Sequence, residues 1–207
     1  MGIFPATSAN IPDAAIAQCN RSWNESDMME DVLNFWFREL APRRWFGGGP
    51  ELDDVIRTRF GALVEKAMQG TLDDWAASPR GCLALIILLD QFTRNIFRGQ
   101  PEAFAGHVQA EALSQRAIRE GMDKALTFAE RQFLYMPLMH AEDPALQALS
   151  LEKFIELKKE ADGILKFAQA HADIVDRFGR FPGRNKALGR TSTPEEEALL
   201  ASGKGNF

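Results

Sequence analysis

Eight consecutive apolar residues, Cys82 to Leu89, form the longest apolar run in this chain of 207 residues. The run is too short to cross a membrane, because a transmembrane helix needs about 20 apolar residues. It instead predicts a helix that other helices surround on every side. We therefore expect Leu85, Ile86, Leu88 and Leu89 to be nearly inaccessible to solvent and to form the centre of the core.

From Asp27 onward the apolar residues recur at helical spacing, and no segment alternates apolar and polar residues as a half-buried strand does. The sequence predicts an all-α fold of antiparallel helical hairpins, either a helical-repeat superhelix or a compact bundle. The predicted helices are 28–40, 51–69, 72–77, 79–95, 101–120, 127–142, 144–162, 164–178 and 194–201. The last of these begins with a capping pattern, Thr193 followed by Pro194 and, three residues after the cap, Glu196.

Length and charge limit the broad class of protein. A domain of this length buries about 70% of its unfolded surface, so we expect one domain over residues 27–207, preceded by a loosely held extension, residues 1–26. The formal net charge of -5 argues against nucleic acid as a partner. The first 26 residues contain no export signal, so a cytoplasmic protein without a membrane partner is expected. The sequence does not predict an oligomeric state.

Cysteine and histidine are sparse. Cys19 and Cys82 have no metal-type spacing and are expected to be reduced, structural thiols. The histidines His107, His140 and His171 include no pair at a zinc-ligand spacing. No cofactor fingerprint is present, so neither a metal site nor a cofactor is expected.

Polar residues follow the apolar run directly, in the sequence DQFTRN from Asp90 to Asn95. Asp90 and Arg94 are four residues apart, as are Gln91 and Asn95, so each pair shares a face of the helix. Because a helix that is apolar all round is buried all round, these polar groups must be paired or bound to a ligand. A structural Asp90–Arg94 pair and a ligand site are the two interpretations.

A proline interrupts the apolar helical stretch FLYMPLMHAED, residues 133–143. Pro137 removes the hydrogen bond that the carbonyl of Phe133 would accept, which predicts a kink or a break. His140 and Glu142 follow it, so ionisable groups come directly after the distortion. His140 is either a structural histidine or an acid–base group.

The segment 176–190, DRFGRFPGRNKALGR, contains four arginines, two phenylalanines, three glycines and a proline. Glycine and proline fix the backbone, the aromatic rings pack against a core, and the guanidinium groups are left to hold a carboxylate or a phosphate. The arginines are Arg177, Arg180, Arg184 and Arg190. A carboxylate of the protein, Asp90 or Glu142, is the alternative partner. His171 precedes the segment on the inward face of its helix, as a core histidine or an acid–base group.

Together these segments resemble a family known as domain of unknown function 924, bacterial and eukaryotic. The motifs that carry the resemblance are VLNFWF (32–37), RWF (44–46), LIILLDQFTRNIFRG (85–99), FLYMPLMHAED (133–143), HADIVDRFGRFPGRN (171–185) and LGRTST (188–193). The resemblance implies a tetratricopeptide-like helical fold and no particular reaction. The chain departs from the family pattern at Thr93, Ala141 and Gly183, where proline, serine and histidine are usual.

A pocket for an anionic small molecule, carboxylate or phosphorylated, is the leading hypothesis. The expected ligand-binding residues are Gln91, Arg94, Asn95, Tyr135, Arg177, Arg180, Arg184 and Asn185. A hydrolase-type enzyme is the first alternative, with catalytic candidates His140, His171, Asp90 and Glu142. The second alternative is a module that binds a peptide or protein partner through exposed aromatic residues, Trp36, Trp45 and Phe46. A single cluster of Asp90, Arg94, His140, His171, Arg180 and Arg184 is also predicted.

Overall fold

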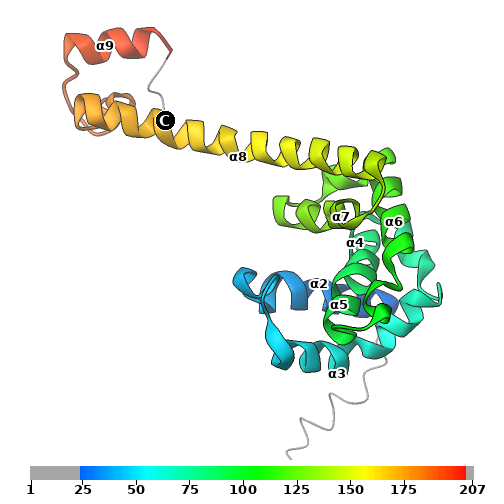
Figure 1. The fold of residues 1–207 in the computed structure, drawn as a ribbon. Coiled ribbons are helices and arrows are strands. Elements are labelled where there is room, and N and C mark those ends of the chain that lie inside the picture. The colour runs from blue at the N-terminus through cyan, green and yellow to red at the C-terminus, as the bar shows by residue number, and fades with distance from the viewer. Residues whose placement is uncertain (1–23, 204–207) are drawn as a thin grey trace, which may run out of the picture. The chain divides into compact units, whose positions relative to one another are not determined.

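The computed structural model describes residues 24–203, which form two compact units (Figure 1). Unit 1 ends at Ala141 and unit 2 begins at Glu142. The described residues form helices, turns and loops and contain no strand, so the predicted all-α fold is confirmed. Nearly all of the predicted extension, residues 1–26, lies outside the described part of the chain. The expectation of a single domain stays a prediction.

Unit 1 is a sequence of α-helices joined by short 3-10 and π-helical segments. Its α-helices are α2 (Glu25–Asn34), α3 (Gly49–Met68), α4 (Pro79–Ile86), α5 (Thr93–Ile96), α6 (His107–Arg119) and α7 (Phe128–His140). Two π-helical segments, Phe35–Glu39 and Ile87–Phe92, extend α2 and join α4 to α5. The 3-10 segments are Pro42–Arg44, Asp73–Ala77, Pro101–Phe104 and Met122–Ala125.

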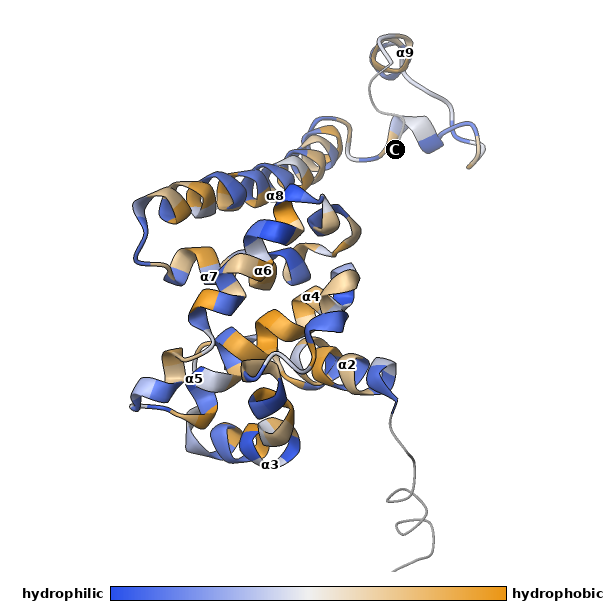
Figure 2. Cartoon of the chain, turned by 90° about the vertical axis from the view of Figure 1, so that its right-hand side faces the viewer, coloured by the Kyte–Doolittle hydropathy of each residue, from blue (hydrophilic) through white to orange (hydrophobic). Residues whose placement is uncertain are grey.

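The apolar run forms α4 and the first part of the π segment that follows it. Helices α2, α6 and α7 pack against α4, and α3 packs against the π segment. Leu85, Ile86, Leu88 and Leu89 are between 0% and 3% exposed, as predicted. Figure 2 shows α4 as a largely apolar helix within unit 1. The apolar run 82–89 therefore lies in the core, as its sequence predicted.

Polar side chains mark where several helices begin. The side chains of Asn24, Ser78 and Thr127 accept hydrogen bonds from backbone N–H groups in the first turns of α2, α4 and α7. At α7 the Glu130 carboxylate also accepts from the backbone N–H of Thr127, which completes a capping box. These caps satisfy N–H groups that a helix start otherwise leaves without partners.

A glycine divides the helix predicted over 101–120. A Cβ atom on Gly106 would lie 2.5 Å from the carbonyl oxygen of Leu89, so only glycine fits where the chain passes this close to the π segment. The chain therefore forms a 3-10 turn, Pro101–Phe104, and then starts α6 at His107. The prediction of one continuous helix over this range was wrong, because the close backbone approach depends on the tertiary structure.

One of the three aromatic residues expected at the surface is in the core. Trp36 is 0% exposed, and its ring makes edge contacts with Phe92 and Phe133 at 5.6 and 5.4 Å between centroids. Phe46, by contrast, is 68% exposed. Trp36 is thus a core residue and not a candidate for peptide binding.

Unit 2 consists of α8 (Pro144–Phe178), the 3-10 turn Pro182–Arg184 and α9 (Pro194–Ala201). Asp143 caps the start of α8, and Gly179, in the left-handed conformation at φ 67°, ends it. Two helices were predicted here, with a break at Gly163, but α8 runs through that residue. One glycine inside a helix costs only about 1 kcal/mol relative to alanine, which is too little to end a helix of 35 residues.

The described helices do not suit a membrane span, and Cys82 lies in the core. No helix among residues 24–203 has the length and apolarity needed to span a membrane. Cys82 is a buried free thiol, and burial raises its pKa to about 11. Its position in the core agrees with the structural role predicted for it, whereas Cys19 lies outside the described residues.

Candidate functional site

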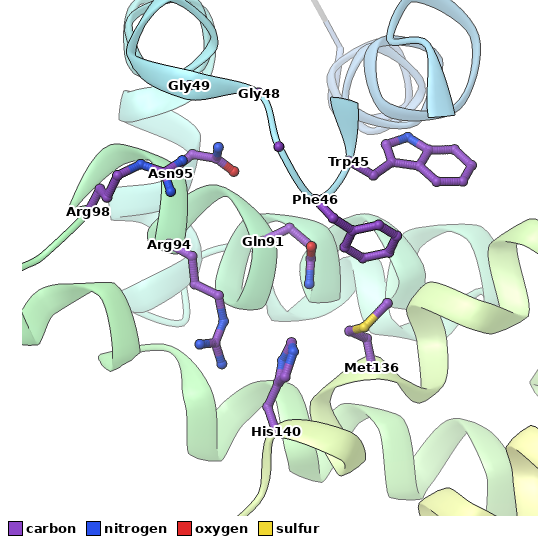
Figure 3. Close-up of a pocket in the computed structure, with 11 residues that line it drawn as sticks. Trp45, Phe46, Gly48, Gly49, Gln91, Arg94, Asn95, Arg98, Met136 and His140 are labelled. Atoms are coloured by element: carbon purple, nitrogen blue, oxygen red, sulfur yellow. The ribbon is translucent and has the colours of Figure 1, made fainter. Parts of the chain in front are cut away.

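A pocket in unit 1 collects many of the polar residues that the sequence singled out. It encloses about 600 Å³ of non-protein space, part of which is open to solvent. It is lined by Trp45, Phe46, Gly47, Gly48, Gly49, Gln91, Arg94, Asn95, Arg98, Met136 and His140 (Figure 3). The lining residues include two arginines and a histidine, and none of them is acidic.

A buried carboxylate lies behind this lining. The side chain of Asp90 is only 1% exposed, and Nδ1 of His140 lies 2.8 Å from its Oδ1 and 3.0 Å from its Oδ2. Gln91 Nε2 also donates a hydrogen bond to Oδ2 of Asp90. The sequence allowed Asp90 or Glu142 as the partner of His140, and in unit 1 that partner is Asp90.

The partners of Asp90 keep it ionised. Burial opposes the charge, but it is outweighed by the hydrogen bond and charge of His140, by the charge of Arg94 and by the hydrogen bond from Gln91. The pKa of Asp90 therefore lies below its ordinary value. A carboxylate only accepts hydrogen bonds, so Nδ1 of His140 carries a proton that it donates to Asp90.

This arrangement fixes the chemistry of the other ring nitrogen. Within residues 24–203, Nε2 of His140 has no hydrogen-bond partner, and His140 lines the pocket. In the neutral imidazole, a proton on Nδ1 leaves Nε2 as an acceptor, and in the charged ring Nε2 is a second donor. A carboxylate that holds one nitrogen and leaves the other facing a pocket is the arrangement that orients a histidine for proton transfer or for binding.

Arg94 forms the predicted pair with Asp90, but that pair uses little of its hydrogen-bonding capacity. Its Nη2 lies 3.3 Å from Oδ1 of Asp90, and its guanidinium carbon lies 5.1 Å from the centroid of the Phe104 ring. Its Nε is buried and has no hydrogen-bond partner within the described residues. An unpaired buried donor is unfavourable, so Arg94 is left able to bind a group in the pocket.

A second buried carboxylate holds the neighbouring polar residues. Asp53 accepts two hydrogen bonds from Arg98, at 2.6 and 2.8 Å, and one of 2.8 Å from Nδ2 of Asn95. The hydrogen bond from Arg98 is the main reason that the pKa of Asp53 lies below its ordinary value, against the opposing effect of burial. This bidentate pair fixes Arg98, whose side chain is 57% exposed, at one edge of the pocket.

The remaining lining is apolar. Trp45 is anchored by a hydrogen bond of 2.9 Å from its indole nitrogen to the carbonyl of Trp36. The Phe46 ring stacks on Phe133 with 6.2 Å between centroids, yet it is 68% exposed. Figure 3 shows Trp45, Phe46 and Met136 on one side of the pocket, Arg94, Asn95 and Arg98 on the other, and Gln91 and His140 between them.

Unit 2 contains the arginine segment, and Arg180 has its partner there. Glu196 accepts from Nε and Nη2 of Arg180 at 2.6 and 2.8 Å and also from Nδ2 of Asn185 at 3.1 Å. The hydrogen bond from Arg180 and that from the backbone of Thr193 lower the pKa of Glu196 to about 2. The sequence allowed Asp90 or Glu142 as an alternative carboxylate partner of these arginines, and within unit 2 the partner of Arg180 is Glu196.

Two further arginines of the segment lie over aromatic rings, and Nη2 of Arg190 donates to the carbonyl oxygen of Phe181 at 3.2 Å. The guanidinium of Arg177 is 4.7 Å from the Phe178 ring centroid, and that of Arg184 is 4.5 Å from the Phe181 ring centroid. Asn185 is buried, and its Oδ1 has no hydrogen-bond partner within the described residues. In unit 2, then, Arg180 and Asn185 serve an internal network, whereas Arg177 and Arg184 are exposed.

Three further predicted residues also lie outside the lining of the unit 1 pocket. The hydroxyl of Tyr135 donates to Asp123 at 2.8 Å inside the core. Nδ1 of His171 lies 2.7 Å from the carbonyl oxygen of Phe167 on the same helix. Glu142 is exposed, in the first position of unit 2. Of the predicted six-residue cluster, Asp90, Arg94 and His140 come together in unit 1, and the full cluster stays a prediction.

Arg98, Trp45, Phe46 and Met136 were missed as lining residues of this pocket. For Arg98 a signal existed, because Asp90, Arg94 and Arg98 follow one another at four-residue spacing. The aromatic residues gave no such signal, since their place beside the pocket depends on how the loop before α3 packs. Within the part of the chain that the structure describes, no group of three or more acidic, histidine or cysteine side chains has a metal-binding arrangement.

Comparison with known proteins agrees with the resemblance seen in the motifs. The model of a family described as a bacterial protein of unknown function, DUF924, matches residues 32–204. The solved structure of a protein of unknown function from Agrobacterium tumefaciens is similar, with 37% sequence identity, a TM-score of 0.61 and coverage of 86% of this chain and 99% of that one. No curated protein matches. Because the family model covers most of the chain, the protein belongs to the DUF924 family.

Proposed function

We propose that this member of the DUF924 family binds a small anionic molecule, a carboxylate or a phosphorylated compound, in the pocket of unit 1. The observation that carries the proposal is Arg94, whose buried Nε has no partner although it belongs to a residue that lines the pocket. An anion bound there would satisfy this donor. A guanidinium group matches the planar, charged oxygens of carboxylates and phosphates better than a neutral donor does.

The surroundings of Arg94 support the same ligand charge. The two acidic residues nearest to the lining, Asp53 and Asp90, are both buried and both already accept hydrogen bonds from several side chains. The charged side chains that line the pocket are therefore cationic, Arg94 and Arg98, while the amide nitrogens of Gln91 and Asn95 donate to the two buried aspartates. Nε2 of His140 adds another donor when the ring is charged.

Ligand binding is tested by isothermal titration calorimetry of the full chain with inorganic phosphate, acetate and citrate. A bound anion is expected to release heat, and it raises the melting temperature because it binds only the folded state. Arg94→Gln is expected to weaken binding at least about tenfold, since hydrogen bonds to charged groups contribute roughly 1.5 to 3 kcal/mol. Arg119→Gln is the matched control, because Arg119 is an exposed arginine of unit 1 outside the pocket.

The two variants separate specific binding from a general charge effect. Both variants remove one positive charge. If both weaken anion binding equally, binding depends on the net charge of the protein and not on a site at Arg94. The absence of any binding to the parent protein at millimolar anion concentrations would contradict the proposal directly.

A hydrolase is the second candidate, and the Asp90–His140 pair is the observation that favours it. A buried carboxylate that orients one imidazole nitrogen leaves the other able to take a proton from water. Hydrolysis of 4-nitrophenyl acetate and 4-nitrophenyl phosphate is the simplest assay. Activity that depends on pH, disappears in His140→Ala and survives in Arg119→Gln would support this candidate. Equal rates for the parent and His140→Ala would rule out His140 as the proton acceptor for these substrates.

A further inference from the structure

The polar and apolar parts of the unit 1 pocket lie on opposite sides. Figure 3 shows Arg94 and Arg98 on one side, Phe46 and Met136 on the other, with His140 between them. A ligand that uses both sides must itself carry charge at one end and apolar surface at the other. The positive charge of the pocket indicates only an anionic ligand, whereas the two separate sides indicate that the ligand also has an apolar part.

The apolar side is built for a planar group. The indole of Trp45 is held by its hydrogen bond to Trp36, and the Phe46 ring is stacked nearly parallel to Phe133, with 10° between the planes. Two aromatic side chains fixed by the core present preformed contact surface, and rings prefer other rings in stacked or edge contacts. Phe46 keeps 68% of its surface exposed, which leaves it free to pack against a ligand.

The charged side is built for one anionic group. Arg94, whose buried Nε is unpaired, lies on it, whereas Nε and Nη2 of Arg98 are already bound to Asp53. The cavity volume is about 200 Å³, below the roughly 300 to 1,000 Å³ of sites for drug-sized ligands, so the pocket favours a compact ligand. A compound with a single acidic group and a single ring therefore fits both the donors and the space better than a polyanion does.

We infer that the ligand of this pocket is a ring-bearing organic acid, a carboxylate or a phosphate monoester, with its anionic group at Arg94 and its ring against Phe46, Trp45 and Met136. The atoms that join the two groups then lie beside Gln91 and His140. This inference rests on the proposed anion site and adds the apolar half of the ligand to it.

Matched probes test the ring separately from the charge. Acetate and phenylacetate differ by a phenyl group, as do methyl phosphate and benzyl phosphate, while benzyl alcohol has the ring without the charge. We expect each phenyl compound to bind the full chain at least about tenfold more tightly than its methyl counterpart, because a ring is removed from water. Benzyl alcohol is expected to bind at least about tenfold more weakly than phenylacetate.

Phe46→Ala provides the decisive variant. Because Phe46 is 68% exposed, the variant is expected to keep the fold, and circular dichroism checks this. The variant is expected to bring the ratio between the affinities for phenyl and methyl probes close to one. Phe128→Ala removes a partly exposed ring at the start of α7, outside the pocket, and is expected to leave the ratio as in the parent.

The outcomes distinguish this inference from the proposal on which it rests. If the methyl probes bind but the phenyl probes bind no better, or if Phe46→Ala leaves the ratio unchanged, the ring-bearing ligand is overturned and the anion site stands. If no charged probe binds, or if benzyl alcohol binds as tightly as phenylacetate, the anion site fails and the inference fails with it.

Discussion

Nδ1 of His140 lies 2.8 Å from Oδ1 of Asp90, and the two residues are 50 positions apart in the sequence. The contact joins the end of α7 to the π segment after α4, which carry His140 and Gln91 of the pocket. Because the Asp90 side chain is almost wholly buried, it needs these partners to remain charged in the core.

Replacing Asp90 is therefore expected to destabilise unit 1. Asp90→Asn keeps the shape of the side chain but removes its charge, and should lower the free energy of unfolding by about 1.5 to 3 kcal/mol, the usual contribution of hydrogen bonds to charged groups. Urea unfolding measures this. Asp54→Asn, an exposed carboxylate paired with Arg57, is the control and should cost less than about 1 kcal/mol. A similar, small loss in both variants would mean that the Asp90 network contributes little to stability.

Leu88 tests the position of the core. Its side chain is completely buried, so Leu88→Ala should lower the free energy of unfolding by about 2 to 5 kcal/mol, through lost burial and the cavity that remains. Val108→Ala, at a position 74% exposed, should change it by less than about 0.5 kcal/mol. Chemical denaturation of both variants gives the comparison, and a loss at Leu88 as small as that at Val108 would place α4 outside the core.

The arginines of unit 2 are expected to respond differently to the same substitution. Arg180→Ala removes the bidentate partner of Glu196, a residue only 2% exposed, whereas the exposed Arg184 contacts the Phe181 ring. Arg180→Ala should lower the melting temperature and Arg184→Ala should change it much less, as circular dichroism can show. If Arg184→Ala is the more damaging variant, Arg184 has a structural partner that the unit 2 network does not include.

The stability contributed by Glu196 should depend on pH in a defined window. Its pKa is lowered from 4.5 to about 2 in the folded protein, so the folded state binds fewer protons than the unfolded state between these values. The contribution is therefore fully present above pH 4.5 and is lost as the pH falls towards 2. Urea unfolding at several pH values should show the parent and Glu196→Gln converging in this window. The exposed neighbour Glu195→Gln serves as the control, and a parent–Glu196→Gln difference that stays constant with pH would contradict the network.

Cys82 should be unreactive in the folded protein. Its thiol is buried and its pKa is raised to about 11, so little thiolate forms at pH 8 and reagents cannot reach it. In a Cys19→Ser variant, which leaves one cysteine, Ellman's reagent should react only after urea is added. Rapid reaction under native conditions would show that the helix around Cys82 opens frequently.

Local patterns in the sequence predicted part of this structure well. The uniform apolarity of 82–89 predicted the core, the four-residue spacing predicted the Asp90–Arg94 pair, and the capping pattern predicted the start of α9 at Pro194. Each of these features depends on residues that are close in the sequence, where spacing alone decides which side chains meet.

The errors concern features that depend on tertiary structure. The burial of Trp36 depends on Phe92 and Phe133, far along the chain, and the turn before α6 depends on the contact between Gly106 and Leu89. The sequence did not predict the partner of Arg180, because the cap of α9 alone accounts for Glu196. In the structure its carboxylate fills both roles, accepting from the Thr193 backbone and from Arg180.

The π-helical segment Ile87–Phe92 has a consequence for how the site varies among relatives. A π turn closes its hydrogen bonds over five residues rather than four, so the segment holds about one residue more than an α-helix of the same span. In a relative that lacks this residue, the segment would be an ordinary α-helix. The flanking helices would still turn the same faces to the core, and the protein would still fold. It would, however, present a different residue to His140, even if its aspartate, glutamine and arginine remain in the same order. Gaps at this point of an alignment, more than substitutions, should therefore separate the relatives that share the Asp90–His140 pair from those that share only the fold.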